Sequence, residues 1–136
     1  MKIVLGLFLT LAFSVAPALA ETIIIVNPAN PVSEISAKEL KAIYKMKKSN
    51  WDSGEAILAV NLAPGNAVRE EFSNKYLGKN TKKMEEYYLK RALSGKGQPP
   101  KSFATEKEII SFVASNTGAI GYVSAADGSV KTVSVK

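Results

Sequence analysis

Short apolar runs alternate with amphipathic segments along the chain, and this pattern predicts an α/β fold. The apolar runs that predict strands are Thr22–Val26, Ile57–Asn61, Ala119–Val123 and Val130–Val135. Four segments between these strands carry apolar residues at helical spacing. The predicted order is β-α-β-α-α-α-β-β, without an internal repeat or a linker that would split it. We therefore expect one α/β domain, with a mixed sheet flanked by about four helices.

Residues that favour helix ends occur at the boundaries of the amphipathic segments. The predicted N-caps are Ser36, Asn66, Thr81 and Thr105, and the predicted C-terminal glycine of the second helix is Gly78. Ser36 and Thr105 each stand three residues before a glutamate, as in a capping box. The stretch Lys96–Lys101 contains two consecutive prolines and is expected to be irregular.

The first 20 residues have the pattern of an export signal. Lys2 supplies positive charge, Ile3–Val15 is apolar and uncharged, and Ala18-Leu19-Ala20 fits the small-residue cleavage rule. A membrane-spanning helix is the alternative, but it needs roughly 20 apolar residues. We therefore expect a signal peptide at residues 1–20, a domain at residues 21–136, and a periplasmic protein that does not span the membrane after processing.

Composition narrows the classes of function. The chain has no histidine and no cysteine, which excludes Ser-His and Cys-His nucleophilic sites and ordinary zinc sites. We therefore expect no enzyme, no cofactor and no metal site. The net charge of +6 favours anionic solutes or surfaces. Because Arg69 and Arg91 are the only arginines and the lysines are dispersed, nucleic acid is not the expected partner.

The segment Ala56–Phe72 is the most informative part of the chain, because it predicts a strand, a Pro-Gly turn and a helix that begins at Asn66. Backbone N–H groups in the first helical turn lack helical partners, and the helix dipole favours an anion there. The candidate ligand-binding residues are Asn61, Gly65, Asn66, Ala67 and Val68. Asn66 equally suits a plain N-cap, and Gly65 a turn with positive φ. Arg69, in the first helical turn, would place a cation near this candidate site, but a solvent-facing side chain is the preferred interpretation.

Four segments, in the same order, resemble the phosphate-binding proteins of ABC transporters. They are Leu40–Tyr44 with Trp51-Asp52, the strand–turn–helix Ile57–Phe72, Gly95-Lys96-Gly97, and Phe112–Val123. The resemblance extends from Ile35 to about Ala125 and implies the type 2 periplasmic-binding-protein fold. Members of that family close two lobes around the anion. This chain is similar only to the region that forms the second lobe, so the resemblance implies a single-lobe, PBP-like domain.

The resemblance also implies how the binding loop differs from that of the family. Family members place an arginine at the strand end, which falls here at Asn61 or Leu62, and a Ser-Gly-Thr on Asn66-Ala67-Val68. Charge-assisted hydrogen bonds contribute about 1.5–3 kcal/mol each, against about 0.5–1.5 kcal/mol for neutral ones. We therefore expect weak or partner-assisted binding of inorganic phosphate or another small oxyanion.

Two functions remain as hypotheses. The first is a periplasmic solute-binding-type protein, related to phosphate binding for ABC transport, with the anion at a helix N-terminus. The second is a non-receptor periplasmic interaction module, which keeps one lobe as a docking domain for an ABC-transporter or envelope protein. Two copies that face each other could also rebuild a cleft.

Overall fold

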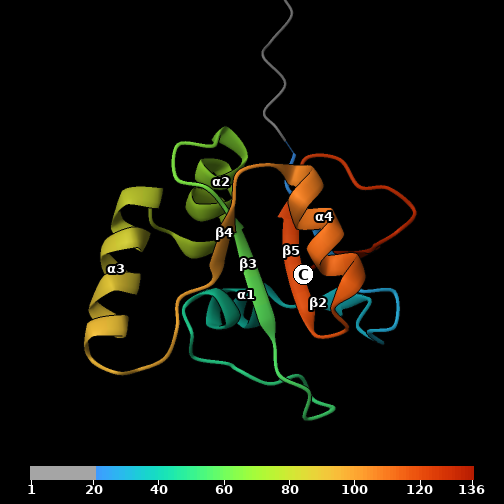
Figure 1. Ribbon diagram of the computed structural model, residues 1–136, viewed down its shortest axis with the longest axis horizontal. Coiled ribbons are helices and arrows are strands. Elements are labelled where there is room, and N and C mark those ends of the chain that lie inside the picture. Colours follow the sequence, from blue (N-terminus) through green and yellow to red (C-terminus); the bar gives the residue numbers. More distant parts are fainter. Residues whose placement is uncertain (1–20) are drawn as a thin grey trace, which may run out of the picture.

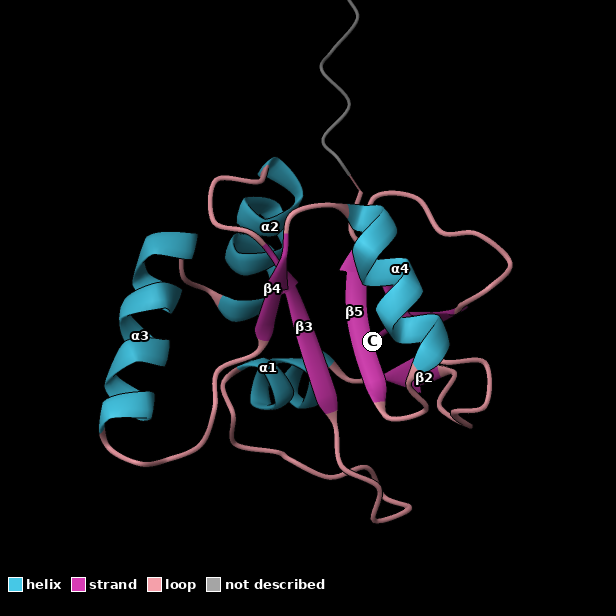
Figure 2. Cartoon of the chain, in the orientation of Figure 1, coloured by secondary structure: helices cyan, strands magenta, loops and turns pink. Residues whose placement is uncertain are grey.

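A computed structural model describes residues 21–136, and the predicted signal peptide at residues 1–20 lies outside the described residues. The described chain forms a six-stranded mixed sheet with helices on its faces and beside it (Figures 1 and 2). The elements are β1 (Ile23–Val26), β2 (Glu34–Ile35), α1 (Ala37–Tyr44), β3 (Leu58–Leu62), α2 (Ala67–Phe72), the π-helical turn η1 (Ser73–Leu77), α3 (Thr81–Leu93), β4 (Lys101–Phe103), α4 (Glu106–Ser115), β5 (Ala119–Val123) and β6 (Lys131–Val135).

The strand order across the sheet is β2-β6-β1-β5-β3-β4. Strand β1 lies antiparallel between β5 and β6, whereas β3 lies parallel between β5 and β4. Strand β2 lies parallel to β6, so β1 runs opposite to the other five strands of the described sheet. Because β5, β3 and β4 run the same way, their carboxyl ends meet at one edge, where the loops into α2 and α4 begin.

Helices cover the central strands on both faces, which explains why β1 and β5 are almost entirely apolar. The five residues of β5 are all buried. A Cβ atom on Gly121 would lie 2.8 Å from Ile109, which places α4 against that face of β5. The next residue, Tyr122, packs instead against Tyr44 of α1 and Phe72 of α2. Figure 1 shows α4 in front of the sheet and α1 behind it.

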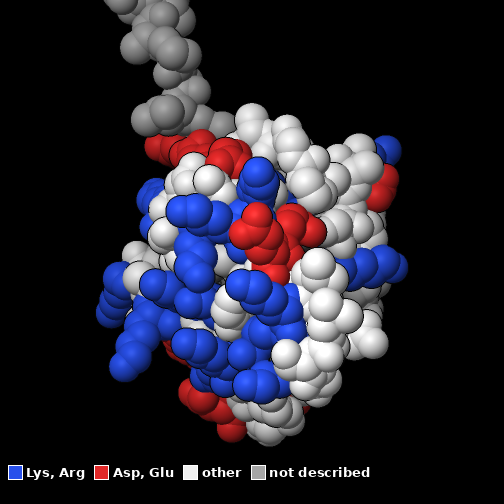
Figure 3. All heavy atoms as spheres, turned by 90° about the vertical axis from the view of Figure 1, so that its left-hand side faces the viewer, with Lys and Arg blue, Asp and Glu red and all other residues white. Residues whose placement is uncertain are grey.

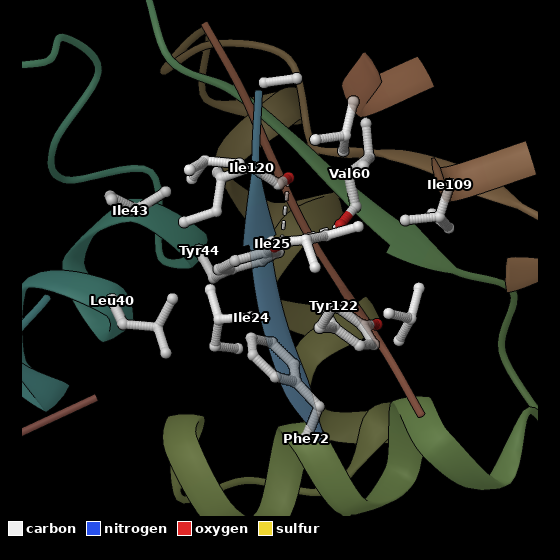
Figure 4. Packing of buried hydrophobic residues seen from close by; sticks show 14 of the residues in the cluster. Ile24, Ile25, Leu40, Ile43, Tyr44, Val60, Phe72, Ile109, Ile120 and Tyr122 are labelled. Atoms are coloured by element: carbon white, nitrogen blue, oxygen red, sulfur yellow. Dashed lines mark hydrogen bonds between the residues drawn. The ribbon is translucent and has the colours of Figure 1, made fainter. Parts of the chain in front are cut away.

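Three aromatic rings form the centre of the core between the sheet and α1–α2 (Figure 4). The rings of Phe72 and Tyr122 stack at 3.9 Å between centroids, and Tyr44 meets Phe72 edge-on at 4.7 Å. The buried Tyr44 hydroxyl donates a hydrogen bond to the carbonyl of Val60, at 2.9 Å. This contact ties α1 to β3 and satisfies a polar group that would otherwise be costly to bury.

The structure confirms the four predicted strands and four predicted helical segments, with boundary shifts of one or two residues. Ser36, Asn66 and Thr105 are the N-caps of their helices, and Gly78, at φ 67°, ends the second helical segment. The cap predicted at Thr81 is wrong, because the side chain of Asn80 accepts the Lys83 N–H and Thr81 is already helical.

Two short edge strands and one irregular helical turn were not predicted from the sequence. Strand β2 has two residues and β4 has three, and each pairs in parallel with one neighbour. Lys101, expected to be irregular, is the first residue of β4. The helix that begins at Asn66 continues through η1, a π-helical turn, before it ends at Gly78. Such short elements lack the periodic pattern on which sequence prediction depends.

Candidate ligand-binding site

The junction between β3 and α2 holds most of the predicted ligand-binding residues, at the edge where the parallel strands end. After β3, the Ala63 N–H donates to the carbonyl of Phe103 (2.8 Å), which fastens the loop to β4. The Asn66 N–H then donates to the carbonyl of Ala63 (3.1 Å), which closes a tight turn. Gly65 stands in this turn at φ 90°, a conformation that glycine adopts without strain.

Asn66 is the N-cap of α2. Its Oδ1 atom accepts hydrogen bonds from the N–H groups of Val68 (2.8 Å) and Arg69 (3.3 Å). Two of the N–H groups that could have contacted an anion therefore already have a partner. Within residues 21–136, the N–H groups of Gly65 and Ala67 and the Nδ2 group of Asn66 donate to no other residue.

Asn61 lies inside the protein rather than beside this turn. It is 2% exposed, and its Oδ1 atom accepts a 2.8 Å hydrogen bond from the Tyr122 hydroxyl. The same hydroxyl accepts the Leu62 N–H at 3.1 Å, and burial raises the pKa of Tyr122 well above the usual tyrosine value. The structure therefore brings Gly65, Asn66 and Ala67 together at the surface and engages the Asn61 side chain in the core.

Arg69 is buried, so the solvent-facing orientation expected from the sequence is wrong. Its residue exposure is 2%, and its Nη1 atom donates to the carbonyl of Leu62 at 3.2 Å. Its Nη2 atom forms an ion pair with the Glu85 carboxylate of α3. An arginine does therefore lie at the end of β3, although it comes from the helix and is neutralised by a carboxylate.

A second set of anion-binding groups lies at the same edge and is occupied by the chain itself. The backbone N–H of Ser124, directly after β5, donates to the carboxylate of Glu106 at the start of α4. The Ser124 hydroxyl lies 2.8 and 2.9 Å from the two oxygens of that carboxylate. These groups are therefore satisfied without a ligand, whereas the turn at Gly65–Ala67 retains unpaired donors.

Two further features of residues 21–136 bear on function. No three His, Cys, Asp or Glu side chains within this range gather as metal ligands. A groove lies at the opposite, amino end of β3, lined by apolar residues such as Ile43, Met46 and Phe112 and edged by Lys48 and Lys101. Trp51 does not line it, because its ring is buried and its indole N–H donates to the carbonyl of Gly118 at 3.0 Å.

Comparison with known proteins decides the family. A family model described as the PBP superfamily domain matches residues 12–135. The chain belongs to this family. None of the curated proteins matches this PBP domain.

Solved structures with the same fold include receptors for phosphate. An ABC-type phosphate transport receptor from Vibrio cholerae is 23% identical, with a TM-score of 0.66, over 84% of this chain and 45% of its own. A putative phosphate ABC transporter substrate-binding protein from Clostridium perfringens, described with bound phosphate, is 25% identical, with a TM-score of 0.68, over 84% and 44% of the two chains. The PBP domain thus spans less than half the length of these proteins.

The comparisons confirm the predicted resemblance and the fold class. The PBP domain has the architecture of a single lobe, with one six-stranded mixed sheet and four helices among its described residues. No helix within residues 21–136 has both the length and the hydrophobicity that crossing a membrane requires.

Proposed function

We propose that this PBP domain is an exported, solute-binding-type protein, related to phosphate binding for ABC transport, that binds a small oxyanion at the β3–α2 junction. The observation that carries the proposal is the set of unpaired donors at the turn: the Gly65 and Ala67 N–H groups and the Asn66 Nδ2 group. The relative from Clostridium perfringens, described with bound phosphate, supports inorganic phosphate as the first ligand to test.

The cap geometry explains how Asn66 can serve both the helix and a ligand. Because its Oδ1 atom accepts the N–H groups of Val68 and Arg69, the Nδ2 half of the same amide is left as a donor. Three neutral donors at about 0.5–1.5 kcal/mol each correspond to a dissociation constant between tens of millimolar and about one millimolar. Val68 contributes to this site through the cap, and Asn61 through the packing of the strand beneath it.

We propose that the protein is located in the periplasm and that its partner is an ABC-transporter or envelope protein. The export-signal pattern of residues 1–20 supports the location, and the ABC transporter relatives support a transporter or envelope protein as partner. The proposal assigns no catalysis, because the chain contains neither the histidine nor the cysteine on which Ser-His and Cys-His sites depend. Weak binding by one lobe would be completed by the surface of such a partner.

Calorimetric titration of the mature protein with phosphate and then sulfate tests the site. The informative variant is Asn66→Asp, which keeps an oxygen for the Val68 and Arg69 N–H groups but removes the Nδ2 donor and adds a negative charge. We expect wild type to bind at millimolar concentration and Asn66→Asp to lose this binding while it stays folded. The matched control is Asn80→Asp, the same change at the N-cap of α3, which should bind as wild type does.

Two results would contradict the proposal. One is no heat and no NMR shift of the Gly65–Val68 amides at millimolar phosphate or sulfate. The other is equal binding by wild type and Asn66→Asp, which would locate the anion elsewhere on this basic protein.

A second candidate is a docking domain that binds no anion of its own. The observation that favours it is that Asn61 and Arg69 are both engaged inside the protein, by Tyr122 and by Leu62 with Glu85. This candidate predicts silent titrations together with a specific protein complex in the cell envelope. Cross-linking in intact cells that recovers no partner, with a monomeric protein at high concentration, would count against it.

A further inference from the structure

The groove at the amino end of β3 lies beside a part of this strand that β4 does not cover. On one side, β3 pairs with β5 from Leu58 onward, whereas on the other side β4 begins only opposite Val60. The chain that leads into β4 contains Pro99 and Pro100, which have no backbone N–H and cannot extend the ladder. The edge of β3 at Leu58 and Ala59 therefore borders the groove.

Most residues that line the groove are apolar, and they come from several parts of the fold. Ile43 belongs to the end of α1, Met46 follows that helix, Phe112 belongs to α4 and Leu58 to β3. Leu58 is 43% exposed, so a large apolar side chain faces solvent here. The volume of the groove is about 480 Å³, within the range of roughly 300–1,000 Å³ that is typical of sites for small organic molecules.

Met46 lines the groove from a backbone conformation that is unfavourable for methionine. Its φ is 63°, and no other non-glycine residue within residues 21–136 has a positive φ. Because α1 ends at Tyr44 with Lys45 as its C-cap, Met46 occupies the position after the cap, where glycine is the usual residue. Strained residues of this kind occur most often at functional sites. The methionine side chain at this position supplies part of the apolar wall, which glycine would not.

Two exposed lysines that line the groove are not neutralised by the described protein. Lys48 lines it too, but forms ion pairs with Glu39 and Asp52. Lys96 and Lys101, in contrast, have no carboxylate within 4.0 Å in residues 21–136. Figure 3 shows lysines and arginines gathered over much of the side of the molecule that carries α3, with a smaller acidic group among them. The charge around the groove therefore favours an anion.

We infer that this groove binds a small organic anion with an apolar body, such as an aliphatic or aromatic carboxylate or sulfonate. The apolar walls contact the body of this ligand, and Lys96 with Lys101 contact its charged end. An inorganic oxyanion has no apolar part and gains nothing from the walls. The groove lies at the opposite end of β3 from the turn at Gly65–Ala67, so this site is separate from the proposed oxyanion site.

Two fluorescent probes with the same aromatic body test the inference on the mature protein. Anilinonaphthalene sulfonate carries a negative charge, and N-phenylnaphthylamine is the uncharged counterpart. We expect saturable binding of the sulfonate. Decanoate, which has an apolar chain and a carboxylate, should displace it, whereas inorganic phosphate at the same ionic strength should not.

Two variants separate the contribution of the charges from that of the walls. Lys96→Glu with Lys101→Glu should weaken binding of the sulfonate at least about tenfold and leave binding of the uncharged probe largely unchanged. Met46→Gly removes part of the wall and should weaken both probes, by about tenfold. This variant should remain folded, because glycine adopts the positive φ without strain.

Two matched controls should bind both probes as wild type does. Lys38→Glu with Lys82→Glu makes the same change of net charge at exposed positions outside the groove, and Leu89→Ala shortens an exposed apolar side chain elsewhere. Thermal unfolding of each variant checks that it is folded.

Equal weakening of the sulfonate by the two charge variants, or unchanged binding by Met46→Gly, would overturn the inference. Displacement of the sulfonate by inorganic phosphate would overturn it in favour of a site for compact anions. Self-association that excludes the probes would overturn it in favour of a second copy of the chain in the groove. Asn66→Asp should bind both probes as wild type does, so the failure of either site can be told from that of the other.

Discussion

Arg69 and Glu85 form an ion pair between α2 and α3 in which one partner is buried and the other is not. The Arg69 side chain is 2% exposed, whereas that of Glu85 is 46% exposed. The Arg69 guanidinium also donates to the carbonyl of Leu62 at the end of β3, at 3.2 Å. Arg69 therefore links α2 to both β3 and α3. We expect the loss of stability to depend on which of the two partners, Arg69 or Glu85, is removed.

Removal of Glu85 should destabilise the fold more than removal of Arg69. Glu85→Ala leaves a buried guanidinium without its counter-charge, which costs about 3 kcal/mol or more in comparable cases. Arg69→Met leaves a half-exposed carboxylate, which water can solvate, and the Leu62 carbonyl without its guanidinium donor. A neutral acceptor without a partner costs less than an unpaired buried charge, and methionine keeps most of the packing volume. Chemical denaturation of both variants measures the difference in the free energy of unfolding.

Glu86→Ala is the control for this comparison. Glu86 is the exposed neighbour of Glu85 on α3 and forms no ion pair among the described residues, so its loss should change stability by no more than about 0.5 kcal/mol. A larger loss for Arg69→Met than for Glu85→Ala would contradict the proposed asymmetry. It would show that the guanidinium matters for its packing and its hydrogen bond rather than for its charge.

Arg69 also shows where sequence reasoning failed. A charged residue in the first turn of a helix is usually exposed, and a cation there opposes the helix dipole. The sequence signals no partner, because Glu85 is sixteen residues away along the chain and meets Arg69 only after α3 packs. The sequence likewise gives no sign of the hydrogen bond between Asn61 and Tyr122, because Tyr122 comes from β5, sixty-one residues later.

Features that depend on a few neighbouring residues, in contrast, were predicted correctly from the sequence. Asn66 and Gly78 confirm their predicted roles because caps and left-handed glycines depend on a few adjacent residues. The central strands were predicted because burial on both faces requires continuous apolar runs, such as Ile23–Val26. Strands β2 and β4 were missed because two or three residues at a sheet edge show no periodicity, and only their neighbours define them.

The N-cap of α2 predicts that two substitutions of Asn66 differ in their effect on the stability of the fold. Asn66→Ala removes the acceptor for the Val68 and Arg69 N–H groups and should cost about 1 kcal/mol. Asn66→Asp keeps that acceptor and adds a charge that the helix dipole favours, so its stability should stay near wild type. Thermal unfolding monitored by circular dichroism measures both. Equal destabilisation by the two variants would show that the amide group, rather than the cap oxygen, stabilises this turn.

Gly118 should not tolerate a side chain. A Cβ atom there would lie 2.2 Å from the carbonyl oxygen of Ala56, a backbone atom that cannot move aside cheaply. The Gly118 carbonyl also accepts the indole N–H of Trp51 and the Leu58 N–H. Gly118→Ala should therefore cost at least about 1–3 kcal/mol. Gly128→Ala is the control, because nothing lies within 4 Å of its Cβ position. Equal stability of the two variants would contradict the close approach of the two loops.

Three buried tyrosines predict a loss of stability at alkaline pH. Burial raises the pKa of Tyr88 from 10.0 to about 12, and it raises the pKa values of Tyr44 and Tyr122 as well. Because the folded-state pKa exceeds the unfolded-state value, the stabilisation is complete below pH 10 and is lost as pH rises toward the folded-state pKa.

For Tyr88 alone, the loss should approach about 2–3 kcal/mol once its folded-state pKa is reached. Denaturant unfolding at a series of alkaline pH values, with tyrosinate absorbance recorded in parallel, measures it. Tyr88→Phe gives up the hydrogen bond to the Tyr44 carbonyl, so it should be less stable at neutral pH. Its stability should then decline less steeply above pH 10, because one of the three ionisations is gone. A decline as steep as that of wild type would show that Tyr88 ionises without unfolding the core.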